Sequence, residues 1–260
     1  MSDKAKIFSM ANQKGGVGKT TCAINIAAAL GILKRRVLLL DFDPQGNCST
    51  GMGVLKKNSG VSSFDIVSGA AEASQAIRGT KFEGVDIIPA TMELAGAELL
   101  ISDRNRREFV LSDALDKAMV KEKYDAVIID CPPSLGLLTL NAMVCSDMII
   151  VPMQCEYFAL EGLSQLTYTL NKVQKLYNPS LSLGGVILTM YDGRLNLSIQ
   201  VAREVQRFFP GKVFKSTIPR GVRVSEAPSF GQPVVYYDRN CKPSSAYLEI
   251  AREMISKFKI

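Results

Sequence analysis

Residues 15–21, GGVGKTT, have the residue types and the spacing of a phosphate-binding loop. In such a loop, consecutive backbone N–H groups surround the phosphates of a nucleotide, a lysine reaches the terminal phosphates and a hydroxyl binds Mg²⁺. The positive end of the following helix adds to the attraction. Lys19 would neutralise charge between the phosphates, and Thr20 would bind Mg²⁺ directly. The predicted phosphate-binding residues are Gly15, Gly16, Val17, Gly18, Lys19, Thr20 and Thr21.

The start of this loop departs from the usual pattern. The first position of G-x-x-x-x-G-K-[ST] is a glycine, but here it is Gln13, and Lys14 follows it immediately. If one chain binds one nucleotide, Lys14 has no evident role, because Lys19 already supplies a cation for the terminal phosphates. The second lysine therefore needs a separate explanation.

Acidic residues lie at the ends of two apolar segments. Asp41 and Asp43 close the segment RVLLLDFD (36–43), and Asp130 lies near the end of YDAVIIDCP (124–132). Ligands bind at the carboxyl ends of the strands of a parallel sheet, so we expect these carboxylates and the phosphate loop to share one edge. Asp130 and Asp41 are predicted to hold Mg²⁺ through water.

Asp43 has a different predicted role. Transfer of a phosphoryl group to water depends mainly on positioning and on neutralising charge, and Asp43 could orient the attacking water. The run 42–51, FDPQGNCSTG, is rich in turn-forming residues, which is typical of a loop that senses the terminal phosphate. No arginine lies in this run or in the phosphate loop. A cation from another subunit would meet that need.

Short apolar segments alternate with segments of helical periodicity. The apolar segments, read as strands, are 6–12, 36–43, 85–90, 124–132, 147–153, 184–192 and 212–219. Helical periodicity covers 19–33, 108–121, 157–177, 196–209 and 244–258. Strands separated by helices imply right-handed crossovers. The sequence therefore predicts a single α/β domain of the P-loop NTPase type over residues 1–260, with a mostly parallel twisted sheet and helices on both faces.

The composition is that of a globular protein. The 260 residues are 47% hydrophobic and 22% charged, and no apolar run approaches the roughly 18–20 residues of a membrane span. The short lead MSDKAKIFSMAN runs directly into the phosphate loop, so we expect neither a signal peptide nor a separate N-terminal DNA-reading domain. The six cysteines form no C-x-x-C pair and histidine is absent, which favours reduced thiols in a cytoplasmic protein.

Positive charge is concentrated in one segment. The net charge of the chain is +6, and residues 194–223 contain one acid, Glu204, beside seven basic residues: Arg194, Arg203, Arg207, Lys212, Lys215, Arg220 and Arg223. Two interpretations remain open at this point. The segment is either a solvated basic face or a surface that contacts nucleic-acid phosphates without reading sequence.

Four motifs together resemble one protein family. They are KGGVGKTT (14–21), DFDPQGN (41–47), VIIDCPPS (127–134) and IPRGVRVSEAPSFGQP (218–233). The first motif, a deviant Walker A sequence, is typical of the broader ParA/MinD group. All four together resemble the ParA/Soj ATPases that partition chromosomes and plasmids, and the resemblance runs from about residue 5 to the C-terminus.

This resemblance gives Lys14 a role. In ParA/Soj proteins, ATP and Mg²⁺ binding closes a sandwich homodimer, and the lysine that matches Lys14 crosses the interface to contact the partner's phosphates. The resemblance therefore implies that Lys14 and Lys19 both act on the nucleotide in catalysis and that Asp43 supports hydrolysis. It also places the base near Pro219 and Gly221. Many relatives have asparagine at the position of Gly221, so a backbone contact is implied there.

The resemblance also favours one interpretation of the basic segment. Relatives bind non-specific DNA as dimers through arginines that match Arg194 and Arg223, and dimerisation joins two weak patches. It implies a nucleoid-associated ATPase with weak intrinsic activity, whose hydrolysis is stimulated by a ParB-type partner and whose output is the segregation of a chromosome or plasmid. Membrane binding is not expected.

Two alternatives differ in what the ATPase acts on. A MinD-like ATPase would bind membrane through an amphipathic C-terminal helix, and residues 244–260 do carry an apolar stripe, although Glu249 and Glu253 would repel anionic lipid. An electron-transfer ATPase similar to the nitrogenase iron protein would share an iron–sulfur cluster between subunits. Cys131 and Cys155 lack the glycine-flanked or C-x-x-C setting of that family.

Overall fold

The computed structural model describes residues 4–54, 60–156 and 159–260. Seven strands form one sheet in the order β3-β4-β2-β5-β1-β6-β7. Neighbouring strands in it are parallel except for β3 and β4. The strands are β1 Lys6–Met10, β2 Val37–Asp41, β3 Arg78–Gly79, β4 Val85–Ile88, β5 Ala126–Asp130, β6 Met148–Gln154 and β7 Ser182–Thr189.

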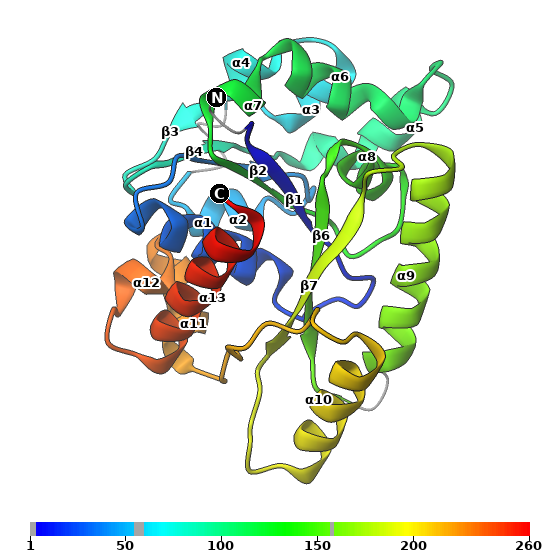
Figure 1. Cartoon of the computed structure of the whole chain (residues 1–260). Coiled ribbons are helices and arrows are strands. Elements are labelled where there is room, and N and C mark those ends of the chain that lie inside the picture. The colour runs from blue at the N-terminus through cyan, green and yellow to red at the C-terminus, as the bar shows by residue number, and fades with distance from the viewer. Residues whose placement is uncertain (1–3, 55–59, 157–158) are drawn as a thin grey trace.

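Helices connect the strands and lie on both faces of the sheet (Figure 1). The α-helices are α1 Lys19–Ile32, α2 Asn47–Gly51, α3 Ser63–Ser68, α4 Ala73–Ala76, α5 Ala97–Ile101, α6 Val110–Lys117, α7 Val120–Lys123, α8 Leu137–Cys145, α9 Ala159–Leu176, α10 Asn196–Phe208, α11 Val222–Glu226, α12 Val234–Tyr237 and α13 Lys242–Phe258. Short 3-10 helices are η2 Met92–Gly96, η3 Arg107–Phe109 and η4 Ala227–Phe230.

The central strands are apolar because both of their faces are covered. All five residues of β2 and all five of β5 are buried, as expected for parallel strands between two helical layers. Alternate side chains of β2 enter two separate cores: Leu39 packs with α1 and α13, while Leu38 and Leu40 pack with α3, α5 and α6. A third core joins β6 and β7 to α8, α9 and α10. The predicted α/β class, with helices on both faces of a mostly parallel sheet, is confirmed.

Two predicted elements are wrong in detail. Residues 212–219 form no strand, only isolated bridges at Val213 and Pro219. The N–H of Lys215 donates to the Glu253 carboxylate on α13 at 3.0 Å, so this segment leaves the ladder along β7, and Pro219 has no N–H to give. The predicted helix 108–121 is divided into η3, α6 and α7, and the break falls at Met119, which has a φ of 53°.

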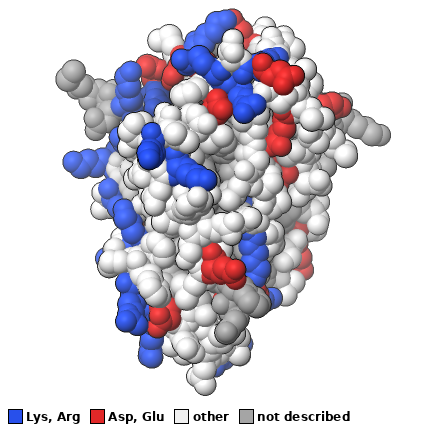
Figure 2. All heavy atoms as spheres, turned by 90° about the vertical axis from the view of Figure 1, so that its right-hand side faces the viewer, with Lys and Arg blue, Asp and Glu red and all other residues white. Residues whose placement is uncertain are grey.

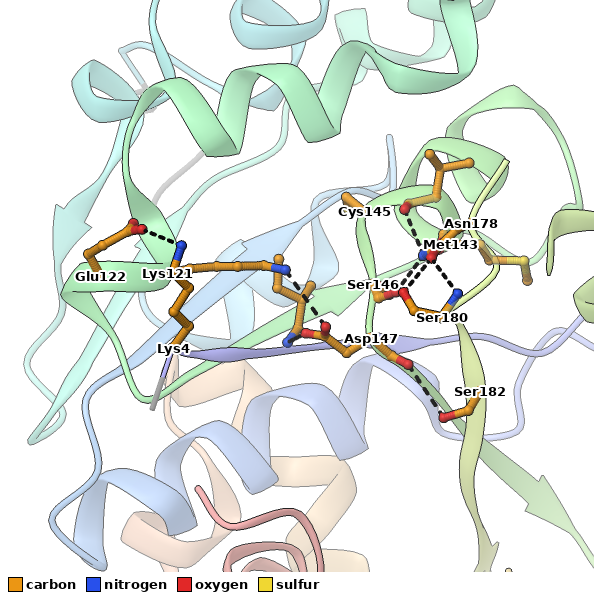
Figure 3. A network of polar contacts seen from close by, with 12 residues as sticks. Lys4, Lys121, Glu122, Met143, Cys145, Ser146, Asp147, Asn178, Ser180 and Ser182 are labelled. Carbon is orange, nitrogen blue, oxygen red and sulfur yellow. Dashed lines mark hydrogen bonds and ion pairs between the residues drawn. The ribbon is translucent and has the colours of Figure 1, made fainter. Parts of the chain in front are cut away.

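The strand register brings the predicted site to one edge. Asp130 pairs with Met10 of β1 and with Asp41 of β2, so the carboxyl ends of these three strands are level. Side-chain hydrogen bonds connect the segments at the amino ends of the strands, which Figure 3 shows. Asp147 accepts the N–H of Ile7 at 2.8 Å, and the Asn178 amide donates to the carbonyls of Val144 and Ser146 at the C-terminal end of α8.

Candidate functional site

The phosphate loop connects β1 to α1 and is open to solvent on one side. Gly16 and Gly18 have φ values of 74° and 89°, a region that glycine adopts without steric cost. A Cβ atom added at Gly15 or Gly16 would meet nothing within 4 Å. The loop is therefore concave and free of side chains beside the N-terminus of α1, a 14-residue helix, which is the arrangement that binds phosphate.

Neighbouring strands hold this loop from behind. Asn12 Nδ2 donates to the carbonyl of Pro152 at 2.8 Å, and Asn12 Oδ1 accepts the N–H of Lys14 at 3.0 Å. The Thr189 hydroxyl donates to the carbonyl of Val17 at 2.8 Å. The contacts of Asn12 with Pro152 and of Thr189 with Val17 could not be predicted from the sequence, because 140 and 172 positions separate the partners. They fix the shape of the loop before a ligand binds.

Lys19 is buried at the base of the loop. Its ammonium donates to the carbonyl of Lys14 at 3.1 Å. Burial lowers the pKa of Lys19, while the nearby Asp130, Cys131 and Asp43 raise it in part. Lys19 and two of the predicted carboxylates therefore interact at this edge, as the sequence predicts.

Asp130 is a buried carboxylate that lacks a fixed partner. Neither of its oxygens has a well-formed hydrogen bond among the described residues, although the Thr20 hydroxyl lies close enough to favour the ionised form. Burial, followed by the Asp41 charge, raises its pKa well above the usual range. A buried carboxylate of this kind is stabilised by a cation, so Thr20 and Asp130 fit a hydrated Mg²⁺ that also binds phosphates.

Both oxygens of the Asp41 carboxylate accept hydrogen bonds from the protein. Its Oδ2 accepts the N–H of Ser49 at 2.7 Å and the hydroxyl of Ser49 at 2.6 Å, and its Oδ1 accepts the N–H of Asp43 at 3.3 Å. Burial raises the pKa of Asp41 to about 6, despite the opposing effect of these hydrogen bonds. Asp41 therefore connects the end of β2 to α2. This structural role is additional to the predicted role of holding Mg²⁺ through water.

The pKa of Asp41 predicts a pH-dependent stability. Its folded value lies above the unfolded value, so the contribution of Asp41 is fully present below about pH 4 and is lost as the pH rises through about 6. We expect nucleotide-free wild type to lose stability relative to Asp41→Asn by about 3 kcal/mol as the pH rises from about 4 to about 7. Urea unfolding of both proteins measures this, and a difference that does not change with pH would refute it.

Asp43 begins the turn that leads into α2. It is 8% exposed, and its Oδ1 accepts the N–H of Gln45 at 2.9 Å while its carbonyl accepts the N–H of Gly46. Part of the predicted switch loop 42–51 is thus the short helix α2. The turn keeps the Asp43 carboxylate close to Lys19, whose pKa it raises.

A cavity of about 470 Å³ lies beside the phosphate loop. Gly18 and Thr21 form one wall, and Pro219 and Gly221 belong to the other. A Cβ at Gly221 would lie 2.9 Å from Cγ of Pro243, so the proline ring fills the space of a side chain at this position. Further lining residues are Thr189, Met190, Ile218, Arg220, Val222, Val224, Ser225, Pro228 and Tyr247. The structure therefore brings the predicted base-binding residues next to the phosphate loop.

Lys14 lies on the rim of the loop. Its ammonium forms an ion pair with Glu156, which follows β6 by two residues. The side chains of both residues are close to half exposed, at 44% and 46%. Within this chain, Lys14 points toward Glu156 while Lys19 occupies the base of the cradle.

Arg194 and Arg223 are exposed, and each is paired with acids. Arg194 contacts Asp192, whose pKa it lowers to about 2, and Arg223 contacts Glu226 and Asp238. Arg194 lines a groove of about 650 Å³ together with Arg220 and Lys242. This groove shares Pro219 and Arg220 with the cavity beside the phosphate loop. The side of the molecule seen in Figure 2 has Lys and Arg along one margin and a large uncharged area at its centre.

Comparison with known proteins identifies the family. The AAA domain family matches residues 5–183. The chromosome partitioning protein ParA of Caulobacter vibrioides is 50% identical over 252 residues, which cover 97% of this chain and 94% of that protein. The chain belongs to the ParA/Soj family. The sporulation initiation inhibitor protein Soj of Bacillus subtilis is also 50% identical, over 96% of this chain and 98% of Soj. The family resemblance stated from the four motifs is confirmed.

Solved structures agree with this assignment. A structure described as cobyrinic acid a,c-diamide synthase of Mycobacterium smegmatis with bound ADP and magnesium is 38% identical, with a TM-score of 0.85 and coverage of 98% of this chain and 96% of that one. The cell division ATPase MinD of Pyrococcus furiosus has a TM-score of 0.81 at 27% identity over 97% and 99% of the two chains. The P-loop fold of the ParA/MinD group is therefore confirmed.

The described residues contain neither a membrane-spanning helix nor a self-sufficient metal-binding cluster. No helix in this part of the chain is long and apolar enough to cross a bilayer. The same residues contain no group of three or more histidine, cysteine or acidic side chains arranged to hold a metal ion by themselves. A Mg²⁺ ion at Thr20 would accordingly take most of its ligands from phosphate and water, as Mg²⁺ commonly does.

Proposed function

We propose that this protein is an ATP-dependent switch for DNA partition. ATP with Mg²⁺ binds the phosphate loop through Gly15–Thr21 and the base cavity at Pro219 and Gly221. Two ATP-bound subunits close into a sandwich dimer, and the dimer binds non-specific DNA through Arg194 and Arg223. Slow hydrolysis, stimulated by a ParB-type partner, returns the protein to monomers that leave the nucleoid.

The observation that carries this proposal is the position of Lys14. One cation, Lys19, lies at the base of the cradle, and a second stands half exposed on its rim. Lys19 can meet the terminal phosphates of its own nucleotide. The exposed rim lysine is available to a nucleotide held by a second subunit, which would make dimer formation depend on ATP.

The roles of the carboxylates follow from their surroundings. Asp130 would hold hydrated Mg²⁺ beside Thr20, with Asp41 acting through water and through the loop that it anchors. Asp43 would orient the water that attacks the terminal phosphate, since its turn places it next to Lys19. Lys14 from the partner would supply the cation that this site lacks.

Dimerisation tests the proposal, with two variants that change it in opposite directions. Lys14→Ala is expected to abolish ATP-dependent dimers while ATP still binds the monomer. Glu156→Gln frees Lys14 from its ion pair in both subunits. Because each exposed pair contributes at most about 1 kcal/mol, we expect the dimer dissociation constant to fall by up to about 30-fold. Analytical ultracentrifugation with ATP or ADP measures both.

The control for Glu156→Gln is Glu161→Gln, an exposed acid on α9. It removes the same charge without freeing Lys14, so it should behave as wild type. ATP-dependent dimers of normal affinity in Lys14→Ala would contradict the proposed function.

The MinD-like alternative has less support from the C-terminal helix. The apolar side chains Tyr247, Ile250 and Met254 of α13 are buried in the core that includes α1, so they are occupied by the fold. Co-sedimentation with anionic liposomes that requires ATP and is lost on deletion of residues 246–260 would favour that alternative.

A further inference from the structure

Ser49 has a buried hydroxyl group and lies in the segment 42–51, which the sequence predicts to be a switch loop. It is 2% exposed and lies in the third position of α2. Its hydroxyl donates to Asp41 Oδ2 at 2.6 Å and accepts the N–H of Ala90 at 3.0 Å. One side chain thus joins three segments: the end of β2, the start of α2 and the residues that follow β4. A hydroxyl with both a donor and an acceptor contact in a buried site has a fixed orientation.

The same contact fixes Asp41 and, through it, Asp43. Asp41 Oδ2 is held by the N–H and the hydroxyl of Ser49, which leaves Oδ1 directed at the N–H of Asp43. Residues 41–49 are therefore closed into a ring whose two ends meet at the Asp41 carboxylate. Asp43 lies within this ring, and its charge is one of those that raise the pKa of Lys19.

We infer that Ser49 is a positioning residue for hydrolysis: its hydroxyl orients Asp41, which holds the backbone of Asp43 and so places the Asp43 carboxylate against the attacking water. This inference rests on the proposed function for the role of Asp43. Ser49 itself touches neither nucleotide nor water in this scheme.

The expected consequence is a loss of rate without a loss of binding. The phosphate loop and the base cavity share no hydrogen bond with Ser49, so nucleotide affinity should persist when the hydroxyl is removed. A displacement of about 1 Å in a positioned group can reduce a rate about 100-fold. For Ser49→Ala we therefore expect kcat to fall at least about tenfold, with KM for ATP within about twofold of wild type.

Two variants make the test specific. Ser49→Thr keeps the hydroxyl and should retain most of the activity. Ser63→Ala is the matched control, because Ser63 is fully buried and its hydroxyl has no hydrogen-bond partner among the described residues. It removes the same atom at an equally buried site and should leave kcat unchanged.

Hydrogen exchange of the nucleotide-free proteins gives a second readout that does not depend on ATPase activity. We expect the backbone amides of residues 42–48 to exchange at least about tenfold faster in Ser49→Ala, because the ring is open, with the core strands unchanged. If wild type fails to hydrolyse ATP, the proposed function is wrong, and the exchange rates still decide the role of Ser49. The inference is overturned if Ser49→Ala matches wild type in kcat or exchange, if KM rises in step with the loss of kcat, or if Ser49→Thr is as impaired as Ser49→Ala.

Discussion

Asp43→Ala is expected to lower kcat for ATP hydrolysis at least about 100-fold while ATP affinity stays within about threefold of wild type. The Asp43 charge acts on Lys19, whose pKa it raises, and its removal takes away the group proposed to orient the attacking water. Its hydrogen bond to the N–H of Gln45 contributes on the order of 1–3 kcal/mol to the fold, which is small beside the core that holds β2, so the variant should fold. Single-turnover hydrolysis and nucleotide binding measure the two quantities.

Asp43→Asn separates charge from shape. The amide oxygen can still accept the N–H of Gln45, but a neutral amide cannot favour a developing hydroxide in the way a carboxylate does. The variant should therefore be as slow as Asp43→Ala with an intact turn. On DNA, both variants should persist as ATP-bound dimers. A parallel loss of ATP binding and turnover would show that Asp43 supports the nucleotide site in general.

The second large effect concerns DNA. Arg194→Glu combined with Arg223→Glu should weaken retention on non-specific duplex DNA at least about 100-fold, because each reversal replaces an attraction to phosphate by a repulsion and a dimer carries both changes twice. ATP-dependent dimerisation should be spared, since the ion-pair partners of both arginines, namely Asp192, Glu226 and Asp238, lie outside the phosphate loop. Filter retention at several salt concentrations measures the effect, and the salt slope should become shallower.

The matched control is Arg36→Glu with Arg106→Glu. These arginines are also exposed, and each is paired with a single acid, Asp125 for Arg36 and Asp113 for Arg106. Arg36 directly precedes β2, so it lies at the amino end of that strand, away from the phosphate loop. The charge change is identical. If both double variants lose DNA binding equally, net charge is responsible and the assigned surface is wrong. If Arg194→Glu with Arg223→Glu still binds DNA at moderate salt, DNA contacts another face.

The sequence predicts those parts of the site that depend on local pattern. The phosphate loop is a continuous motif, and an acid at the end of an apolar strand falls at the carboxyl edge of any parallel sheet. Asp41 and Asp130 therefore meet as expected. The family resemblance points to Pro219 and Gly221 as base-binding residues, and in the structure both line the cavity beside Gly18. Their contact with the base stays a prediction.

Contacts between distant segments could not be predicted in this way. Glu156 lies 142 residues from Lys14, and nothing local distinguishes it from other exposed acids. In the sequence, Ser49 is one of several turn-forming residues. Its partners Asp41 and Ala90 come close to each other only when β2 and β4 pair. The ring of Pro243 against Gly221 and the contact of Glu253 with Lys215 are of the same kind. The contact of Lys215 with Glu253 lies in the segment 212–219, which was predicted as a strand and has only isolated bridges.

ATP is proposed to control binding to DNA, and retention on a non-specific duplex measures this control. Wild-type protein is measured with ATP, with ADP and without nucleotide, each across a range of salt. We expect retention with ATP alone, and this retention should fall steeply as salt rises, because phosphate contacts release counterions. Equal retention in all three states would contradict the switch, and no retention in any state would show that DNA is not what the ATP-bound protein binds.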